Sequence, residues 1–121
     1  MSESASALQA GDEFPERLRE ILGPGNVLLD PSDREFYSTD LSFRSREVAA
    51  AIIRPTSVDS LATAVAFCTS HGYSVLARGG GMSYTSSYTP AETRAVLVDM
   101  QAFSRILEIN ADDMYVTVEA G

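Results

Sequence analysis

Three consecutive glycines, Gly79, Gly80 and Gly81, are the residues of this sequence best suited to hold a ligand. Because they have no Cβ atoms, their backbone can take positive φ values and approach a bound group closely. Successive N–H groups in such a stretch can point into one concavity and bind phosphate oxygens. Arg78 before them offers positive charge, and Ser83 after them offers a hydroxyl donor. This combination predicts a site for a diphosphate rather than for a neutral ligand.

Two better-known phosphate loops do not fit these residues. The triphosphate loop G-x-x-x-x-G-K-[ST] requires a lysine, and the chain contains none. The dinucleotide fingerprint G-x-G-x-x-G matches at Gly79 and Gly81 but has Tyr84 at its third glycine, and residues 85–90 resemble a turn instead of opening a helix. Taken alone, the glycines would more simply form a loose surface turn, and Arg78 a surface charge at a strand end.

The loop follows a predicted strand, helix and strand. Residues 48–54 form a short apolar run closed by Pro55, the pattern of a strand buried on both faces. The next segment predicts a helix with Thr56 as its N-cap, ended by His71-Gly72. Its apolar face comprises Val58, Leu61, Val65 and Cys68. Residues 73–77 predict a second strand, so the three elements have the order of a parallel crossover unit.

The flanking segments complete the predicted fold. Asp12 can cap a helix that ends near Leu22 at Gly23-Pro24, and residues 30–43 indicate a short helix and a covering loop. Further along, residues 95–99 predict a third strand. Residues 106–110 and 115–119 alternate like an antiparallel hairpin. We therefore expect a mixed α/β (α+β) fold, in which a small parallel sheet with flanking helices precedes the start of an antiparallel subdomain.

Composition limits the possible partners. The 121 residues suffice for one domain, and 9 arginines against 17 acidic residues make nucleic acid and anionic membranes poor partners. Cys68 and His71 are the single cysteine and histidine, so we expect no internal disulfide, no metal site and a reducing, cytoplasmic setting. Cys68 fits a core position and His71 a helix end. Residues 1–11 read as a disordered start without a secretory signal, and no apolar stretch is long enough to span a membrane.

Other candidate residues have simpler interpretations. Tyr37 is expected to anchor a loop and Asp40 to be a solvated acid. Asp112 and Asp113 are expected to form a turn, because adjacent carboxylates point apart on an extended chain and make a poor metal site.

Six segments, in this order, are similar to the N-terminal FAD subdomain of the vanillyl-alcohol-oxidase (PCMH-type) class of flavoproteins. They are Ile53-Arg54-Pro55, Thr56-Ser57-Val58, residues 72–75, residues 78–83, residues 96–100 and residues 116–121. The resemblance spans residues 37–121, and residues 12–121 would be the N-terminal part of the domain.

The resemblance implies that FAD lies between two subdomains. The glycine loop would hold its pyrophosphate, with Arg78, Met82, Ser83 and Tyr84 beside the glycines and Pro55 near the cofactor; Met82 and Tyr84 could equally pack under the loop. One departure is Met82 before Ser83, where a Thr-Ser pair is usual. Some members have a histidine in this loop that bonds covalently to the flavin, and this sequence has Gly81 at that place. We therefore expect dissociable FAD.

The implied activity is hydride transfer from an alcohol or 2-hydroxy acid to FAD, with electrons passing to oxygen or a carrier. In this class a cap domain supplies most substrate contacts, so no catalytic residue is assigned. The sequence ends at Gly121 directly after a strand, and we expect the natural polypeptide to continue. The alternative is a non-catalytic fragment or structural piece of a larger assembly, because half of a two-subdomain site offers a ligand only half its contacts.

Overall fold

The computed structural model describes residues 7–9 and 11–121. The disorder expected for residues 1–11 falls mostly on residues 1–6 and 10, which lie outside that description. Helix α1 (Glu13–Leu22) begins after Asp12 and ends at Gly23, as predicted. The Asp12 carboxylate does not cap it, because it accepts a hydrogen bond from the Gln9 amide instead. A short 3-10 turn, η1 (Pro24–Asn26), follows.

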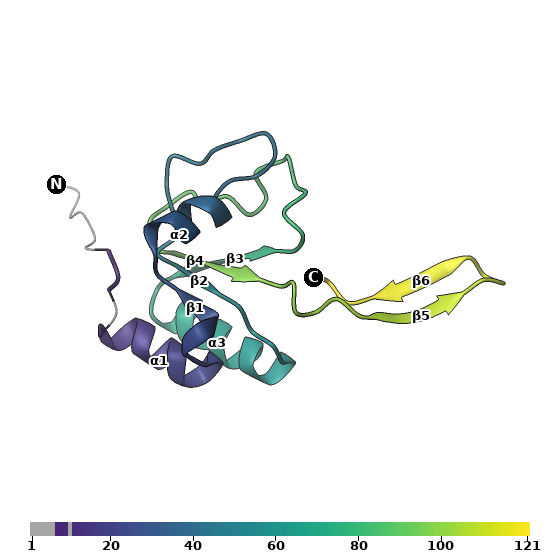
Figure 1. Ribbon diagram of the computed structural model, residues 1–121, viewed down its shortest axis with the longest axis horizontal. Coiled ribbons are helices and arrows are strands. Elements are labelled where there is room, and N and C mark those ends of the chain that lie inside the picture. Colours follow the sequence, from purple (N-terminus) through teal and green to yellow (C-terminus); the bar gives the residue numbers. More distant parts are fainter. Residues whose placement is uncertain (1–6, 10) are drawn as a thin grey trace.

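Four strands form the main sheet, with the order β1-β2-β4-β3 (Figure 1). The three predicted strands are β2 (Ala51–Ile53), β3 (Ser74–Arg78) and β4 (Ala95–Asp99), and they are mutually parallel. β4 lies between the other two, so the crossover through helix α3 (Val58–Ser70) skips one strand position. The sequence analysis missed β1 (Val27–Leu28), a two-residue antiparallel edge. The carboxyl ends of the parallel strands therefore meet at one edge of the sheet.

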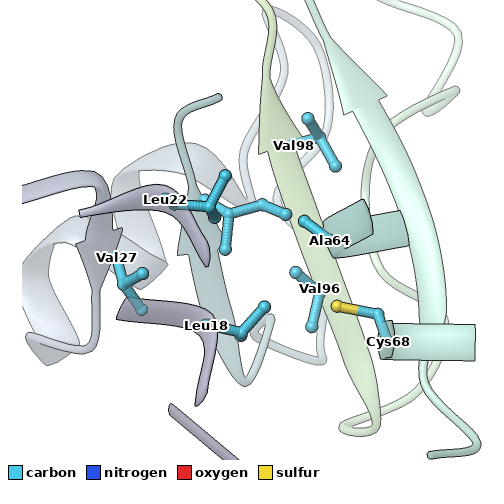
Figure 2. Close-up of a cluster of buried hydrophobic side chains, with 8 residues drawn as sticks. Leu18, Leu22, Val27, Ala64, Cys68, Val96 and Val98 are labelled. Atoms are coloured by element: carbon cyan, nitrogen blue, oxygen red, sulfur yellow. The ribbon is translucent and has the colours of Figure 1, made fainter. Parts of the chain in front are cut away.

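Two layers of side chains bury the sheet. Helices α1 and α3 cover one face, where Leu18, Leu22, Val27, Ala64, Cys68, Val96 and Val98 pack together (Figure 2). On the opposite face Ile52 and Leu97 pack with Ala49 and Tyr88, and helix α2 (Pro31–Tyr37) adds Tyr37. Every residue of β2 is buried, which confirms the burial expected for that strand, and every residue of β4 is buried as well.

The start of α3 differs from the prediction. Ser57, not Thr56, is the N-cap, because its extended backbone lets its hydroxyl accept a hydrogen bond from the Ser60 amide at 3.1 Å. Val58 then lies at the first helical position and is exposed. The buried face runs through Ala64 and Cys68 rather than through Val58, and Leu61 packs partly buried against the same core.

Strands β5 (Ile106–Asn110) and β6 (Tyr115–Val118) form the predicted antiparallel hairpin, which projects from the main sheet (Figure 1). Asn110 closes its turn by accepting a hydrogen bond from the Asp113 amide at 2.9 Å, so Asp113 is a turn residue as expected. A parallel sheet with helices followed by an antiparallel hairpin is the mixed α/β fold that the sequence predicts.

Candidate functional site

The glycine loop, residues 79–90, begins where β3 ends, at the carboxyl edge of the parallel strands. In open α/β sheets this edge is where ligands usually bind. Within residues 7–9 and 11–121, no hydrogen-bond acceptor is recorded for the amides from Gly79 to Tyr84. Amides in the next part of the loop do have partners, because Thr85 N–H donates to the Ser83 hydroxyl and Ser86 N–H to Asp40. A row of unpaired N–H groups is therefore available to a ligand.

Gly81 meets a specific steric demand, whereas a Cβ on Gly79 would make only an ordinary van der Waals contact. Gly81 has a φ of +75°, and a Cβ there would lie 2.9 Å from the Arg78 Cζ. A Cβ on Gly79 would lie 3.5 Å from the carbonyl oxygen of Ala120, since the chain returns to the loop after β6. Gly80 has open space around its Cβ position, and Gly81 rather than Gly80 takes the positive φ that the loop needs.

Arg78 is not a surface charge. Its side chain is buried, with only 7% of the residue exposed, and its guanidinium lies over the rings of Phe36, Tyr37 and Tyr88. Tyr37 is anchored in turn by donating to the Asp99 carboxylate at 2.9 Å. Burial, reinforced by this hydrogen bond to Asp99, raises the pKa of Tyr37, so its hydroxyl remains a donor at neutral pH.

A second loop, residues 38–43, is hydrogen-bonded to the glycine loop. The main contact is made by Asp40 of this second loop. The carboxylate of Asp40 accepts from the Ser42 and Phe43 amides in its own loop and from the Ser86 amide at 2.8 Å. Desolvation raises the pKa of Asp40, but these amide donors outweigh it and bring the pKa below its usual value of 3.8. The expectation of a solvated acid was wrong: Asp40 is 7% exposed, because it joins two loops.

Tyr88 forms a further link between the loops. Its hydroxyl lies 3.2 Å from the carbonyl oxygen of Gly81 and 3.3 Å from that of Thr39. The sequence analysis missed Tyr88 and Asp99 as parts of the site. Asp99 could have been predicted as a site residue, because it is a charged residue at the end of an otherwise apolar strand. No local pattern distinguishes Tyr88.

The other predicted site residues differ in burial and in their distance from the loop; they are Ser83, Met82, Tyr84 and Pro55. Ser83 lies in the loop, and its hydroxyl is 3.0 Å from the Ser87 hydroxyl. Met82 and Tyr84 are 72% and 71% exposed, so neither packs under the loop. Pro55 is buried just after β2, at the same sheet edge but separated from β3 by β4.

An open hollow of about 760 Å³ adjoins the loop. Arg78, Gly80, Gly81 and Met82 line one side, and residues of α2 and the Asp40 loop line the other. Unpaired amides, positive charge and room for a ligand thus lie together. These features fit the pyrophosphate of a dinucleotide.

Cys68 and His71 are far less suited to chemistry. Cys68 is completely buried in the core, and desolvation raises the pKa of its thiol to about 11. His71 is the C-cap residue of α3, as expected. The described residues contain no group of three or more His, Cys, Asp or Glu arranged to bind a metal ion. They also include no helix long and apolar enough to cross a membrane.

A family described as "FAD binding domain" matches residues 49–121, more than half of the chain, and the chain belongs to this family. Glycolate oxidase subunit GlcD of Bacillus subtilis is 27% identical over 109 residues, covering 90% of this chain and 23% of the relative. L-gulono-1,4-lactone dehydrogenase of Mycobacterium tuberculosis H37Rv is 39% identical over 72 residues, covering 60% of this chain and 16% of the relative. The chain is thus an FAD-binding domain of FAD-linked oxidoreductases and spans less than a quarter of these relatives.

Solved structures show the same fold. Alkyldihydroxyacetonephosphate synthase superposes with a TM-score of 0.74 at 17% identity, over 93% of this chain and 23% of that one. p-Cresol methylhydroxylase with substrate bound superposes with a TM-score of 0.72 at 21% identity, over 87% of this chain and 21% of that one. The resemblance to the vanillyl-alcohol-oxidase class is therefore confirmed for family and fold.

Proposed function

We propose that the whole protein is an FAD-dependent oxidoreductase and that the loop from Gly79 to Tyr84 holds the pyrophosphate of FAD. The observation that supports this most is the row of unpaired amides at the carboxyl edge of a parallel sheet, in a chain of the FAD-binding family. Bound FAD would accept a hydride from an alcohol or 2-hydroxy acid and pass the electrons to oxygen or a carrier. The relatives named as a glycolate oxidase subunit and a gulonolactone dehydrogenase support this substrate class.

The chain's own residues bind and orient the cofactor in this proposal. Amides at residues 79–84 would donate to phosphate oxygens, with Ser83 at the loop and Pro55 at the same sheet edge. The loop has no histidine to bond the flavin, so FAD is held without a covalent bond. Because the single cysteine cannot form an internal disulfide, we propose the cytoplasm as the compartment. The net charge of -8 disfavours nucleic acid, and the proposed substrate partner is a small molecule.

The flavin absorption spectrum of the purified whole protein tests the proposal. We expect yellow protein, or uptake of added FAD, and release of the flavin into the supernatant after acid precipitation. A colourless protein that takes up no FAD contradicts the proposed function. Flavin that stays with the precipitate contradicts only the non-covalent attachment.

A second candidate is a structural piece that does not hold FAD by itself. The exposed apolar side chains of the hairpin favour it for the isolated chain, among them Ile106, Ile109, Val116 and Val118. The same spectrum, recorded for residues 1–121 alone, separates the two candidates.

A further inference from the structure

Among the described residues, Arg78 is a buried cation without an anionic partner. Only 7% of the residue is exposed, and its Nε has no hydrogen-bond partner. No carboxylate in the described part of the chain lies within ion-pair distance of its guanidinium. Asp99 is its neighbour in the sheet, but the carboxylate of Asp99 accepts from the Tyr37 hydroxyl and the Gln101 amide. Since burying an unpaired charge is costly, a role beyond folding has to explain its retention.

Three aromatic rings hold the guanidinium in place. Its Cζ lies 4.7 Å from the ring centre of Tyr37, 5.3 Å from that of Phe36 and 5.5 Å from that of Tyr88. Such contacts attract a cation without neutralising its charge. Phe36 and Tyr37 belong to α2, whereas Tyr88 belongs to the glycine loop, where its hydroxyl reaches the carbonyl oxygen of Gly81. The cage therefore joins α2 to the loop around one fixed charge.

The guanidinium also occupies the space of a missing side chain. A Cβ on Gly81 would lie 2.9 Å from Cζ and 3.2 Å from Nε of Arg78, and it would collide with Nη2. Arg78 thus packs directly against the backbone of Gly81, whose φ is +75°. On either side of Gly81 the amides are unpaired. The path of this backbone determines where those amides point.

We propose that Arg78 is a positioning residue for the anionic part of the cofactor. Its caged guanidinium fixes the backbone at Gly81 and supplies positive charge that stays uncompensated until phosphate binds the loop amides. This inference rests on the proposed function, because it assigns the charge to the pyrophosphate of FAD.

The test measures FAD affinity by quenching of flavin fluorescence, and the thermal midpoint of the flavin-free whole protein, for matched variants. Arg78→Met should weaken FAD binding by about tenfold or more, as for loss of a charge-assisted contact. Its flavin-free midpoint should be unchanged or higher, because an uncompensated buried charge is removed. Arg94→Met is the control: Arg94 also lies over a ring, that of Tyr73 at 4.4 Å, but it precedes β4 at the opposite sheet edge. It should leave FAD affinity unchanged.

A double-mutant cycle tests the packing of Arg78 against Gly81. Gly81→Ala should weaken FAD binding more in the wild-type background than in an Arg78→Ala background, where the collision is absent and only the strain of the positive φ remains. Equal costs in both backgrounds would overturn the inference. So would full FAD affinity in Arg78→Met, or a loss of affinity that merely follows a lower flavin-free midpoint. Failure of the wild-type protein to take up FAD would instead overturn the proposed function on which the inference rests.

Discussion

The glycine loop and the β5–β6 hairpin differ in which of their groups are free: the loop has free backbone amides, and the hairpin has exposed apolar side chains. In the loop, the Tyr88 side chain and the Ser86 amide are engaged, the latter by Asp40 of the neighbouring loop, while the backbone amides from Gly79 to Tyr84 are unpaired. In the hairpin the two strands pair their backbones, while apolar side chains such as Ile109 are exposed. Free amides suit a small anion, and a free apolar surface suits another layer of protein. The difference supports the proposed ligand site at the glycine loop rather than at the hairpin.

The largest expected effect is a loss of FAD retention on substitution of Gly80, without a loss of folding stability. Gly80→Val should abolish FAD retention by the whole protein, because the branched side chain would occupy the open space beside the free amides. The flavin-free protein should keep its thermal midpoint, since a Cβ at Gly80 would meet no atom of the described residues within 4 Å apart from its chain neighbours, and its φ is not positive. Flavin absorbance and thermal unfolding measure the two effects. Normal flavin occupancy in the folded variant would show that the cofactor binds elsewhere.

The next largest effect is expected on folding stability at Gly121, where the chain returns from the hairpin to the glycine loop. A Cβ on Gly121 would collide with the Met100 carbonyl oxygen and lie 2.6 Å from that of Phe103. Gly121→Ala should therefore destabilise the protein by about 1–3 kcal/mol, the usual cost of overpacking. Urea unfolding of the whole protein measures this change, with Gly25→Ala as a control whose Cβ meets open space. Equal stability of the two variants would contradict the tight packing at Gly121.

A smaller effect is expected from weakening the contact of Asp40 with the glycine loop. In Asp40→Asn the amide can still accept from Ser42 and Phe43, but its N–H₂ group would face the Ser86 N–H. We expect FAD affinity to fall by about fivefold, the equivalent of one lost hydrogen bond. Glu119→Gln is the control, because that carboxylate bonds Arg105 at the base of the hairpin and should not affect flavin binding. Equal losses in both variants would remove the special role of Asp40.

The same carboxylate predicts a dependence on pH. The folded-state pKa of Asp40 lies below 3.8, so its contribution is complete above that value and disappears as the pH falls through the lower, folded pKa. Flavin release on acidification should therefore include a step below pH 3.8 that Asp40→Asn lacks. A pH titration of flavin fluorescence, with both proteins in parallel, measures this step. Identical release curves would contradict it.

An effect of about the same size as that at Asp40 is expected at Ser83. Its hydroxyl already lies 3.0 Å from the Ser87 hydroxyl and accepts from the Thr85 amide at 3.3 Å, so it is shared between the loop and any ligand. Ser83→Ala should weaken FAD binding by about 0.5–1.5 kcal/mol, the value of one ordinary hydrogen bond. Fluorescence titration measures the change. A loss as large as that of Gly80→Val would mean that a side chain, and not the backbone, dominates the site.

Sequence reasoning succeeded where the signal is local. The apolar run at β4, the stop at Gly23 and the turn at Asn110 each depend on a few adjacent residues, and each appears where predicted. It failed where the burial of a side chain depends on residues that are distant in the sequence. Val58 follows the apolar period of α3 but is exposed at the first helical position, and Asp40 is buried where its carboxylate accepts from the amide of Ser86, 46 residues away.

By itself the sequence determined that a strand ends in three adjacent glycines within a mixed α/β domain, because period, glycine content and turn residues act over short stretches. Only the tertiary structure decided that β4 separates β2 from β3 and that Arg78 lies beneath Gly81 among three aromatic rings. Phe36, Tyr37 and Tyr88 come from segments separated by about half the chain, and no local pattern encodes contacts over such distances. Packing brings these three rings around the Arg78 guanidinium. The same packing fixes the backbone conformation of the loop, which the glycines alone only permit.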